Sequence, residues 1–225
     1  YNKFWKKLLL CLPILIIFSV FMVYPIFDTL YTSFFSKYML KPGVFCGFDN
    51  FKKAFQDPVF WIGFKNTLII TGGTFLTQAP IGFFLGKYLS APYKNGAFKT
   101  ISFIPYILSG VMTGLIWSFL LDPSFGLFNN IITSMGAKPI LWIGGKVLTP
   151  YSVCLVLLWQ AVGYHSVLFM AGFKMMSKDI IEAAHIDGAS AFQRNWYVVI
   201  PSIKETIKMS ATLILVGGIN QYQQT

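Results

Sequence analysis

Five long runs of apolar residues constrain the fold of this chain more than any other feature of its sequence. About 20 apolar residues in a helix cross the roughly 30 Å hydrocarbon layer of a bilayer, because each residue adds about 1.5 Å. The runs cover residues 8–27, 66–90, 101–121, 151–173 and 207–222. Only 12% of residues are charged, which is about half the share found in soluble domains. The sequence therefore predicts an all-α, polytopic transmembrane helical bundle with five spans.

The first apolar run, residues 8–27, is predicted to be a transmembrane helix and not a cleaved leader. It follows Lys3, Lys6 and Lys7, which a secretory signal could also carry. A signal has a shorter apolar core that ends in small residues at a cleavage site, and this run shows neither feature. Residues 36–65 are mixed and polar, so we expect a loop with one short surface helix there.

Glycines recur in the second and third runs at a spacing that lets transmembrane helices pack closely. One Gly-x-x-x-Gly spans residues 82–86 and another spans 110–114. Small residues at this spacing let two backbones approach each other, although the pattern alone is a weak signal. Pro105 lies in the third run, where a bilayer tolerates proline if neighbouring groups bond the freed backbone. We therefore expect residues 101–121 to form one span.

The basic residues between the runs predict the side of the membrane on which each loop lies, because cytoplasmic loops are enriched in Lys and Arg. With the amino terminus inside, eleven basic residues are on the inner side: Lys3, Lys6, Lys7, Lys87, Lys94, Lys99, Lys174, Lys178, Arg194, Lys204 and Lys208. Seven are then outside: Lys37, Lys41, Lys52, Lys53, Lys65, Lys138 and Lys146. The reverse arrangement fits worse, so we expect a cytoplasmic amino terminus and a cytoplasmic segment at 174–205.

Composition and spacing argue against several other functions. The net charge of +10 could suit a nucleic acid, but the basic residues lie between apolar runs and form no patch with aromatics. An ATP-binding phosphate loop reads G-x-x-x-x-G-K-[ST], whereas Gly82 to Lys87 is one residue short and lacks the hydroxyl. His165 and His185 stand alone in the sequence, and the three cysteines lack metal-ligand spacing. We therefore expect no catalytic residue, no metal and no cofactor on this chain.

The segment at 174–205 contains the signals of two short helices that meet at a sharp bend. Ser177 can cap a first helix, and Gly188 readily adopts the left-handed conformation that ends one. Ser190, with a Gln three residues later, resembles a capping box, and Pro201 ends the second helix or starts the next span. Such a hairpin either docks onto a partner or packs on its own spans, and spacing alone leaves both open.

The same segment resembles the EAA loop of binding-protein-dependent ABC importer permeases. That pattern has Glu-Ala-Ala, two further residues, Asp-Gly-Ala and a later proline. This sequence matches it at Glu182, Ala183, Ala184, Asp187, Gly188, Ala189 and Pro201. Residues 190–194 are similar to the carbohydrate-transporting, maltose-permease-like branch, although Asn195 stands where that branch usually has an aromatic. Residues 47–67 also resemble the approach to the second span in such sugar permeases.

This resemblance implies the fold of a type I ABC importer permease, which has six spans. Because five runs are present, we expect the sixth span to be missing from the carboxyl end. Residues 1–65 would form an N-terminal transmembrane helix with the first extracytoplasmic loop, and residues 66–225 would form the permease domain. The EAA loop would sit in a cleft of a separate ATPase subunit, with Glu182 as its charged contact and Gly188 at its bend.

The resemblance also implies a set of partners. They are a pair of ABC ATPase subunits, which would carry the ATP and Mg, a second homologous permease and an extracytoplasmic solute-binding protein. The chain would lie in a prokaryotic cell membrane, cross it several times and contact the lipid bilayer directly. We expect no contact with nucleic acid.

A path for a sugar through the bilayer needs hydrogen-bonding groups and aromatic faces near its middle. We expect this path to be lined by Trp159, Gln160, Tyr164, Gly218, Asn220 and Gln221. Gln160 and Tyr164 are one helical turn apart and therefore share a face. The same residue types also make ordinary contacts between helices, and that alternative stays open.

Import of a sugar or oligosaccharide is the function that we predict, and import of a polyamine, phosphate or small peptide is the alternative. A less favoured alternative is an ion-coupled secondary carrier. Such carriers usually keep ionisable groups in their spans, whereas residues 151–173 contain no acid, Lys or Arg. A membrane enzyme is not supported, since the sequence offers no carboxylate pair, nucleophile with a base, or metal cluster.

Overall fold

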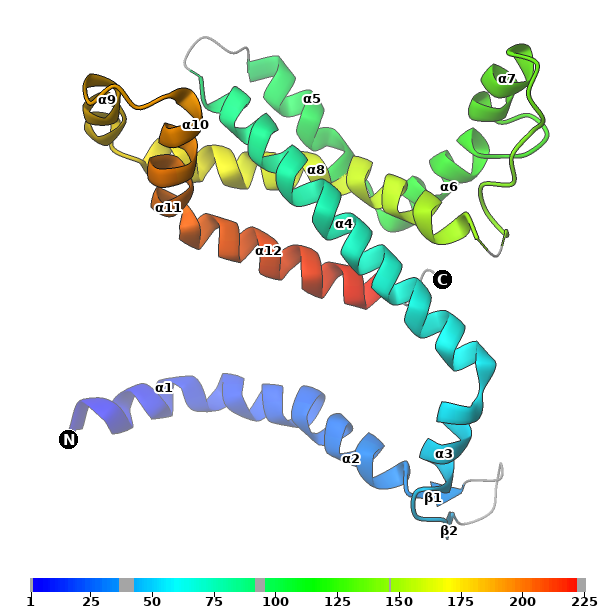
Figure 1. Ribbon diagram of the computed structural model, residues 1–225. Helices are drawn as coiled ribbons and strands as arrows, with labels where there is room; N and C mark the ends of the chain where they lie inside the picture. Colours follow the sequence, from blue (N-terminus) through cyan, green and yellow to red (C-terminus); the bar gives the residue numbers. More distant parts are fainter. Residues whose placement is uncertain (1, 37–42, 92–95, 146, 222–225) are drawn as a thin grey trace. The chain divides into compact units, whose positions relative to one another are not determined.

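The computed structural model describes residues 2–36, 43–91, 96–145 and 147–221 (Figure 1). Residues Lys37, Lys41, Lys94, Lys146 and Tyr222, which entered the sequence predictions, lie outside these ranges, as do the side chains of Lys3 and Lys178. Most of the described backbone is helical, which confirms the predicted all-α class. The chain forms two compact units, Tyr1–Ile62 and Gly63–Thr225, which are described separately.

The first unit begins with a helical segment formed by α1 (Asn2–Phe18), the π-helical turn η1 (Ser19–Val23) and α2 (Tyr24–Thr32). Its residues 5–32 are long and apolar enough to cross a membrane, which confirms the first predicted span. The widened turn has a local cause, because Pro25 offers no amide hydrogen and its ring would clash with the carbonyl four residues earlier. The amide of Tyr24 bonds the carbonyl of Ser19 instead, five residues back.

A small hairpin, a short helix and the first five residues of the following long helix complete the first unit. Strand β1 (Phe35–Ser36) pairs antiparallel with β2 (Val44–Phe45), and α3 (Asp49–Gln56) follows. The Asn50 side chain donates from Nδ2 to the Ser33 carbonyl at 2.8 Å, which ties α3 to the end of α2. The short surface helix was predicted, whereas the two-residue strands were not, because strands of that length show no periodic pattern.

Two long apolar helices dominate the second unit, α4 (Pro58–Ser90) and α8 (Thr149–Met175). The sequence predicted that the first of these would begin at residue 66, and the structure corrects this to Pro58. Asp57 accepts a hydrogen bond from the Val59 amide at 2.8 Å, and proline is well suited to the first helical position. Capping by Asp57 therefore extends the helix well before its apolar run.

The third apolar run, which the sequence predicted as one span, is not one continuous helix. It is divided into α5 (Gly96–Ile107) and α6 (Gly110–Leu120), which meet at an angle of 97°. Pro105 removes one amide donor from the last turn of α5. Ser109 then caps α6 by accepting a hydrogen bond from the Met112 amide at 3.3 Å. A proline followed by an N-cap serine is thus the physical reason for the break.

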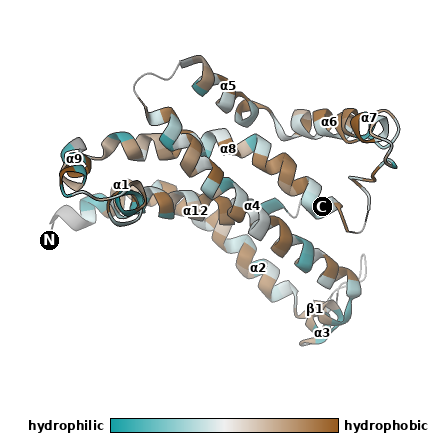
Figure 2. Cartoon of the chain, turned by 45° about the horizontal axis from the view of Figure 1, so that its top comes forward, coloured by the Kyte–Doolittle hydropathy of each residue, from teal (hydrophilic) through white to brown (hydrophobic). Residues whose placement is uncertain are grey.

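Length and composition identify three membrane-spanning candidates among the described residues, or four if the bent pair α5–α6 is one span. The fifth run forms α12 (Lys204–Ile219), whose 16 residues are about 24 Å long. Hydrophobic residues run along α2, α4, α8 and α12 in Figure 2, and many of their large side chains are exposed. Exposed apolar surface of this extent suits contact with lipid or with other spans.

The helices of the second unit approach one another closely at glycines. A Cβ atom on Gly163 in α8 would overlap the Ser102 carbonyl oxygen in α5. On α4, a Cβ on Gly86 would lie 2.6 Å from the Ser166 carbonyl oxygen, so the first predicted Gly-x-x-x-Gly does pack against a helix. In the second such pattern, a Cβ on Gly114 would meet nothing within 4 Å.

The segment between α6 and α8 contains a helix that the sequence did not predict, α7 (Leu127–Ser134). Asn129 is buried and organises this segment. Its amide nitrogen donates to the carbonyls of Asp122 at 3.2 Å and Ile140 at 2.9 Å, and its oxygen accepts from the Ile140 amide at 2.9 Å. This one amide, with nearly all of its donors and acceptors in use, therefore links residues 122 and 140 across the segment.

Candidate functional site

The segment after α8 folds into a hairpin of two short helices, as the sequence predicted. The first is α9 (Lys178–Ile186), and Ser177 caps it by accepting a hydrogen bond from the Asp179 amide at 3.2 Å. Gly188 ends it with φ +75°, a conformation that costs any residue with a Cβ about 1 kcal/mol or more. The Ala189 amide bonds the Ala184 carbonyl at 3.0 Å and closes the turn.

The second helix of the hairpin consists of α10 (Ala191–Gln193), the π-helical turn η2 (Arg194–Val199) and α11 (Ile200–Ser202). The predicted capping box is present: Ser190 accepts from the Gln193 amide at 3.3 Å, and the Gln193 side chain accepts from the Ser190 amide at 2.8 Å. The helix continues through Pro201 and breaks at Ile203, where α12 begins at the next residue. Pro201 therefore widens the turn before it, and the helix ends only after Ser202, so this proline neither ends the helix directly nor starts the next span.

One face of the hairpin is exposed and aromatic. The rings of Phe192 and Trp196 stack with centroids 6.2 Å apart at an interplanar angle of 6°, although these side chains are 73% and 58% exposed. Of the residues that match the EAA pattern, Glu182, Ala183 and Asp187 are exposed beside Gly188, whereas Ala184 and Ala189 are half-buried at the turn. The hairpin thus presents apolar and acidic groups outward, as a docking element does.

The base of the hairpin is fixed to the long helices by a hydrophobic cluster. Its buried members are Phe169 and Phe173 of α8 with Val199 and Ile203, and Phe83, Met176 and Ile207 pack against them. The Phe83 ring contacts the Phe173 ring edge-on at a centroid distance of 5.3 Å. The hairpin therefore has α4, α8 and α12 as its support, and a displacement of its base would displace all three helices.

A polar contact that sequence reasoning missed joins the same hairpin to α4. Lys87 donates from Nζ to Oδ1 of Asn195, and both side chains are half-buried. Lys87 is one helical turn beyond Phe83, so apolar and polar contacts follow one another on one face of α4. Arg194 lines the same small cavity of about 260 Å³ and donates to the Ala189 carbonyl at 3.3 Å. Asn195 thus accepts a charged hydrogen bond at the position where the resemblance described above implies an aromatic.

A cavity of about 310 Å³ lies among α4, α5, α8 and α12, and it brings together four of the residues predicted for the substrate path. These are Gln160, Tyr164, Gly218 and Gln221. The other two predicted residues do not line it. Trp159 contacts Trp117 edge-on at a centroid distance of 5.7 Å, and Asn220 is the exposed C-cap residue of α12. Helical spacing alone could not separate residues that point into the cavity from those beside it.

The cavity also contains polar residues that sequence reasoning missed. Gln78 is only 4% exposed and donates from Nε2 to the Leu157 carbonyl at 2.9 Å. Tyr106 of α5 stacks on Tyr164 with centroids 4.4 Å apart. His165 was interpreted as isolated, but its Nδ1 lies 2.9 Å from the Ser210 hydroxyl in α12. A glutamine inside an apolar run was the available signal, because buried amides in spans are costly unless they serve contacts or a cavity.

One polar atom in the cavity has no partner in the described part of the chain. It is Oε1 of Gln221, which is buried and accepts no hydrogen bond. A buried acceptor without a donor is costly, so the site favours a ligand that offers hydroxyl groups or water. Together with the stacked tyrosines, this lining combines hydrogen-bonding groups with aromatic faces.

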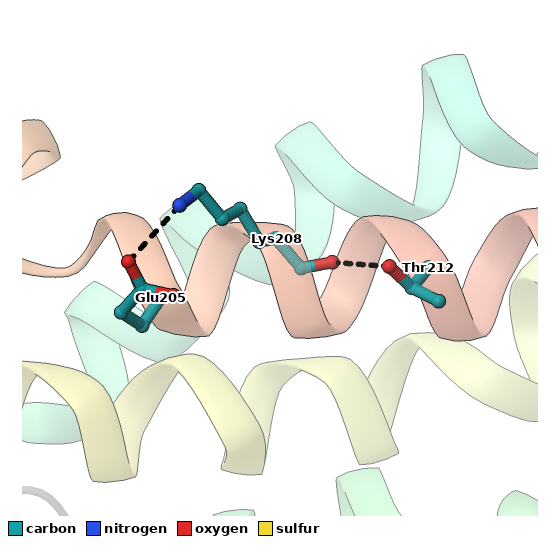
Figure 3. Close-up of polar contacts among 3 residues, drawn as sticks. All are labelled: Glu205, Lys208 and Thr212. Atoms are coloured by element: carbon teal, nitrogen blue, oxygen red, sulfur yellow. Dashed lines mark hydrogen bonds and ion pairs between the residues drawn. The ribbon is translucent and has the colours of Figure 1, made fainter.

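The start of α12 carries exposed charges that separate the hairpin from the apolar helix. Glu205 and Lys208 form an ion pair of 3.0 Å, and Thr212 donates to the Lys208 carbonyl at 2.9 Å (Figure 3). Both charged side chains are mostly exposed, so the pair stabilises the helix by less than about 1 kcal/mol. The charges instead indicate where α12 leaves the aqueous side and enters an apolar environment.

Comparison with known proteins gives a family and several relatives. The family described as "Binding-protein-dependent transport system inner membrane component" matches residues 78–223. The diacetylchitobiose uptake system permease protein NgcF of Streptomyces coelicolor is 30% identical over 191 residues, which are 79% of this chain and 54% of NgcF. The sulfoquinovosyl glycerol transport system permease protein SmoG of Agrobacterium fabrum is 29% identical over 88% of this chain and 66% of SmoG. The chain thus spans about half the length of NgcF and about two thirds of SmoG.

A solved structure has the same fold. It is the crystal structure of a bacterial alginate ABC transporter in complex with an alginate pentasaccharide-bound periplasmic protein. The alignment covers 98% of this chain and 74% of one chain of that structure, at 26% identity and a TM-score of 0.79. This agreement confirms the predicted transmembrane helical bundle. Because the matched family region contains the hairpin and nearly all of the cavity residues, the chain belongs to the family of binding-protein-dependent transport system inner membrane components.

Proposed function

We propose that this chain is a membrane-spanning permease subunit of an ATP-driven importer, and that the imported solute is a sugar or oligosaccharide. The observation that carries the proposal is the capped hairpin with an exposed aromatic face and a base clamped among α4, α8 and α12. A rigid projection on three spans is suited to receiving force from a partner and passing it to the membrane interior.

The hairpin would be held in a cleft of a separate ATPase subunit. Glu182 is exposed on α9 and would pair with a basic residue in that cleft, while Phe192 and Trp196 would bury their rings against it. Two ATPase subunits that close on ATP would move the hairpins of two permeases together. In this scheme ATP and Mg belong to the partner subunits, because this sequence has no phosphate loop of its own.

The cavity at Gln160 and Tyr164 would hold the solute during transfer. Sugars offer many hydroxyl groups together with apolar ring faces, which suits the amides of Gln78 and Gln221 and the stacked pair Tyr106–Tyr164. NgcF, SmoG and the alginate transporter are each named for a carbohydrate or a glycoside, and this supports a sugar over another solute.

The proposal includes an orientation and a set of partners. The amino terminus and the hairpin would face the cytoplasm of a prokaryotic cell, and a solute-binding protein would deliver the sugar from outside. A second permease would complete the pore. Residues 1–65 would supply the first span and outer loop, and residues 66–225 would supply the permease domain.

The experiment uses the complete transporter in proteoliposomes, with its ATPase subunits, second permease and binding protein. Glu182→Lys should weaken co-purification of the ATPase by at least about tenfold, because it reverses a charge at an interface. Gly188→Pro should abolish ATP-dependent uptake, because proline cannot adopt φ +75°. Glu205→Lys, which changes an exposed carboxylate outside the hairpin, is the matched control and should leave both measurements unchanged.

Two outcomes would contradict the proposal. Normal uptake by both hairpin variants would remove the coupling role, and uptake that survives ATP depletion but collapses with an ionophore would indicate a secondary carrier. Solute identity is tested separately by the affinity of the binding protein for a panel of sugars, polyamines, phosphate and peptides. Binding of only a non-sugar would retain the importer and replace its substrate.

A further inference from the structure

A second and larger cavity lies on the other side of Gln160 and is not used by the proposed function above. Its volume is about 540 Å³, and it is bounded by α6, the first half of α8 and the segment before α8. Cavities of about 300–1,000 Å³ are typical of sites for small organic ligands. Leu157 and Gln160 line both this cavity and the one at Tyr164, so the two cavities are neighbours that share a wall.

Two buried polar atoms in this second cavity have no partner among the described residues. They are Oγ1 of Thr113 and Nε1 of Trp117, in side chains that are 2% and 7% exposed. Both residues line the cavity from α6. A buried polar group without a hydrogen bond is destabilising, so these two groups favour an occupant that accepts a hydrogen bond from the indole and exchanges one with the hydroxyl.

The orientation of the Trp117 ring is fixed by its neighbours. It stacks on Phe128 of α7 at a centroid distance of 6.0 Å and meets Trp159 of α8 edge-on at 5.7 Å. A ring held from two sides keeps its N–H direction without a hydrogen bond to hold it. The donor is therefore preorganised for a ligand, which lowers the entropic cost of binding.

The chemistry of the cavity separates two kinds of occupant. A transmembrane helix from another subunit would fill the apolar part around Val153 and Val156, but its backbone groups already bond one another, so it would pair Thr113 and Trp117 only through suitably placed polar side chains. A sugar unit offers apolar ring faces for the valines and oxygen atoms for the indole and the hydroxyl. The unpaired polar atoms therefore favour a hydroxylated ligand.

Position along α8 gives the second cavity a place in the route. It is lined by residues 149–160 of α8, whereas the first is lined by residues 157–165, nearer the hairpin. If the hairpin faces the cytoplasm, the second cavity lies on the outer side of the first. The Gln160 amide at the shared wall is weakly held, since its Nε2 lies 3.5 Å from the Leu108 carbonyl at the break between α5 and α6.

We propose that the cavity at Thr113 and Trp117 is a second sugar subsite, which holds the outer units of an oligosaccharide whose inner end occupies the cavity at Tyr164. Gln160 contacts the chain where it passes from one cavity to the other. This proposal rests on the proposed sugar import and extends it, because it assigns an oligosaccharide, and not a single sugar, as the solute that fills the site.

The test compares sugars of increasing length. Proteoliposomes containing the complete transporter are supplied with malto-, chito- and arabino-oligosaccharides of one to five units, and the series that the wild type imports is then used for each variant. The double variant Thr113→Val and Trp117→Phe removes both donors. It keeps a similar side-chain volume at position 113 and an aromatic ring at position 117. We expect KM to rise by about tenfold for four- and five-unit sugars and to stay unchanged for the shortest imported sugar. Tyr164→Phe, in the inner cavity, should raise KM for every length.

A measurement independent of activity uses Thr113→Cys in a variant without the native cysteines. The five-unit sugar should slow alkylation of the introduced thiol by N-ethylmaleimide about fivefold or more, and the shortest imported sugar should not. Thr212→Cys in the same background is the matched control, because this exposed threonine on α12 bonds its own helix and lines neither cavity, so no sugar should protect it.

Three outcomes would overturn the second subsite while leaving sugar import intact. They are an unchanged KM for long sugars, an equal change in KM at every length, and a thiol at position 113 that the five-unit sugar fails to protect. A wild type that imports none of these sugars would instead refute the proposed function itself.

Discussion

The hairpin after α8 and the cavity among the long helices are built in opposite ways. The side-chain bonds within the hairpin, at Ser177, Ser190 and Arg194, join residues two to five positions apart. In the cavity, Gln78 reaches a carbonyl 79 positions away and His165 reaches a serine 45 positions away. The hairpin can therefore form from local signals alone, whereas the cavity exists only once four helices have packed.

This difference matters for how the two regions would act together. A locally built element keeps its shape when it is pushed, because its caps and turn do not depend on distant contacts. A cavity made of long-range contacts changes shape when one of its helices shifts, since α4, α8 and α12 all contribute to its wall. The proposed importer needs both properties: a hairpin that stays rigid and a cavity that changes shape.

The largest effect is expected where the long-range contacts are tightest, at Gly163. Gly163→Leu would force α5 away from α8, because even a Cβ would overlap the Ser102 carbonyl oxygen. We expect the free energy of unfolding to fall by about 3 kcal/mol or more, and the midpoint of thermal unfolding to fall by about 10 °C. Gly72→Leu is the control, because a Cβ at Gly72 meets nothing within 4 Å. If Gly163→Leu left the midpoint unchanged, the close contact between α5 and α8 would be refuted.

An intermediate effect is expected at the polar contact that joins the two regions, between Lys87 and Asn195. Asn195→Leu leaves the half-buried ammonium without its acceptor, at a cost of about 1–3 kcal/mol. We expect the amount of ATP hydrolysed per sugar imported to rise by roughly two- to fivefold in proteoliposomes, because α4 would follow the hairpin less closely. Lys87→Met should have a similar effect, and the double variant should add little. Fully additive effects would show that the two side chains act independently.

The smallest effect is expected at the exposed local pair on α12. Glu205→Gln removes the ion pair with Lys208, whose side chains are both mostly exposed. We expect the free energy of unfolding to fall by less than about 0.5 kcal/mol. The midpoint of thermal unfolding should stay within about 1 °C of the wild type at about 0.15 M salt. A loss near that of Gly163→Leu would overturn the view that local polar contacts contribute little to the bundle.

The same contrast explains which features the sequence could predict. The two caps, the glycine turn and the first span follow from signals within a few residues, and the structure confirms each of them. The break at Ser109 was missed, because a proline in a span has two outcomes and only packing decides between them. Trp159 and Asn220 were predicted for the substrate path but do not line this cavity, since a helical wheel shows which residues share a face but not what that face meets. The sequence could not assign Gln78, Tyr106 and His165 to the cavity, because their partners lie on helices far away in the sequence.

The two π-helical turns, at 19–23 and 194–199, have a consequence for how this chain tolerates changes in length. Each accommodates one residue more than an α-helix of the same rise, and each is followed by a proline two positions later. Deleting one residue from the second turn would restore the regular ladder and rotate everything before it by about 100° around the helix axis. The ring of Phe192, which precedes this turn, would then face a different side of the hairpin, and the proposed contact of this ring with an ATPase subunit would be lost.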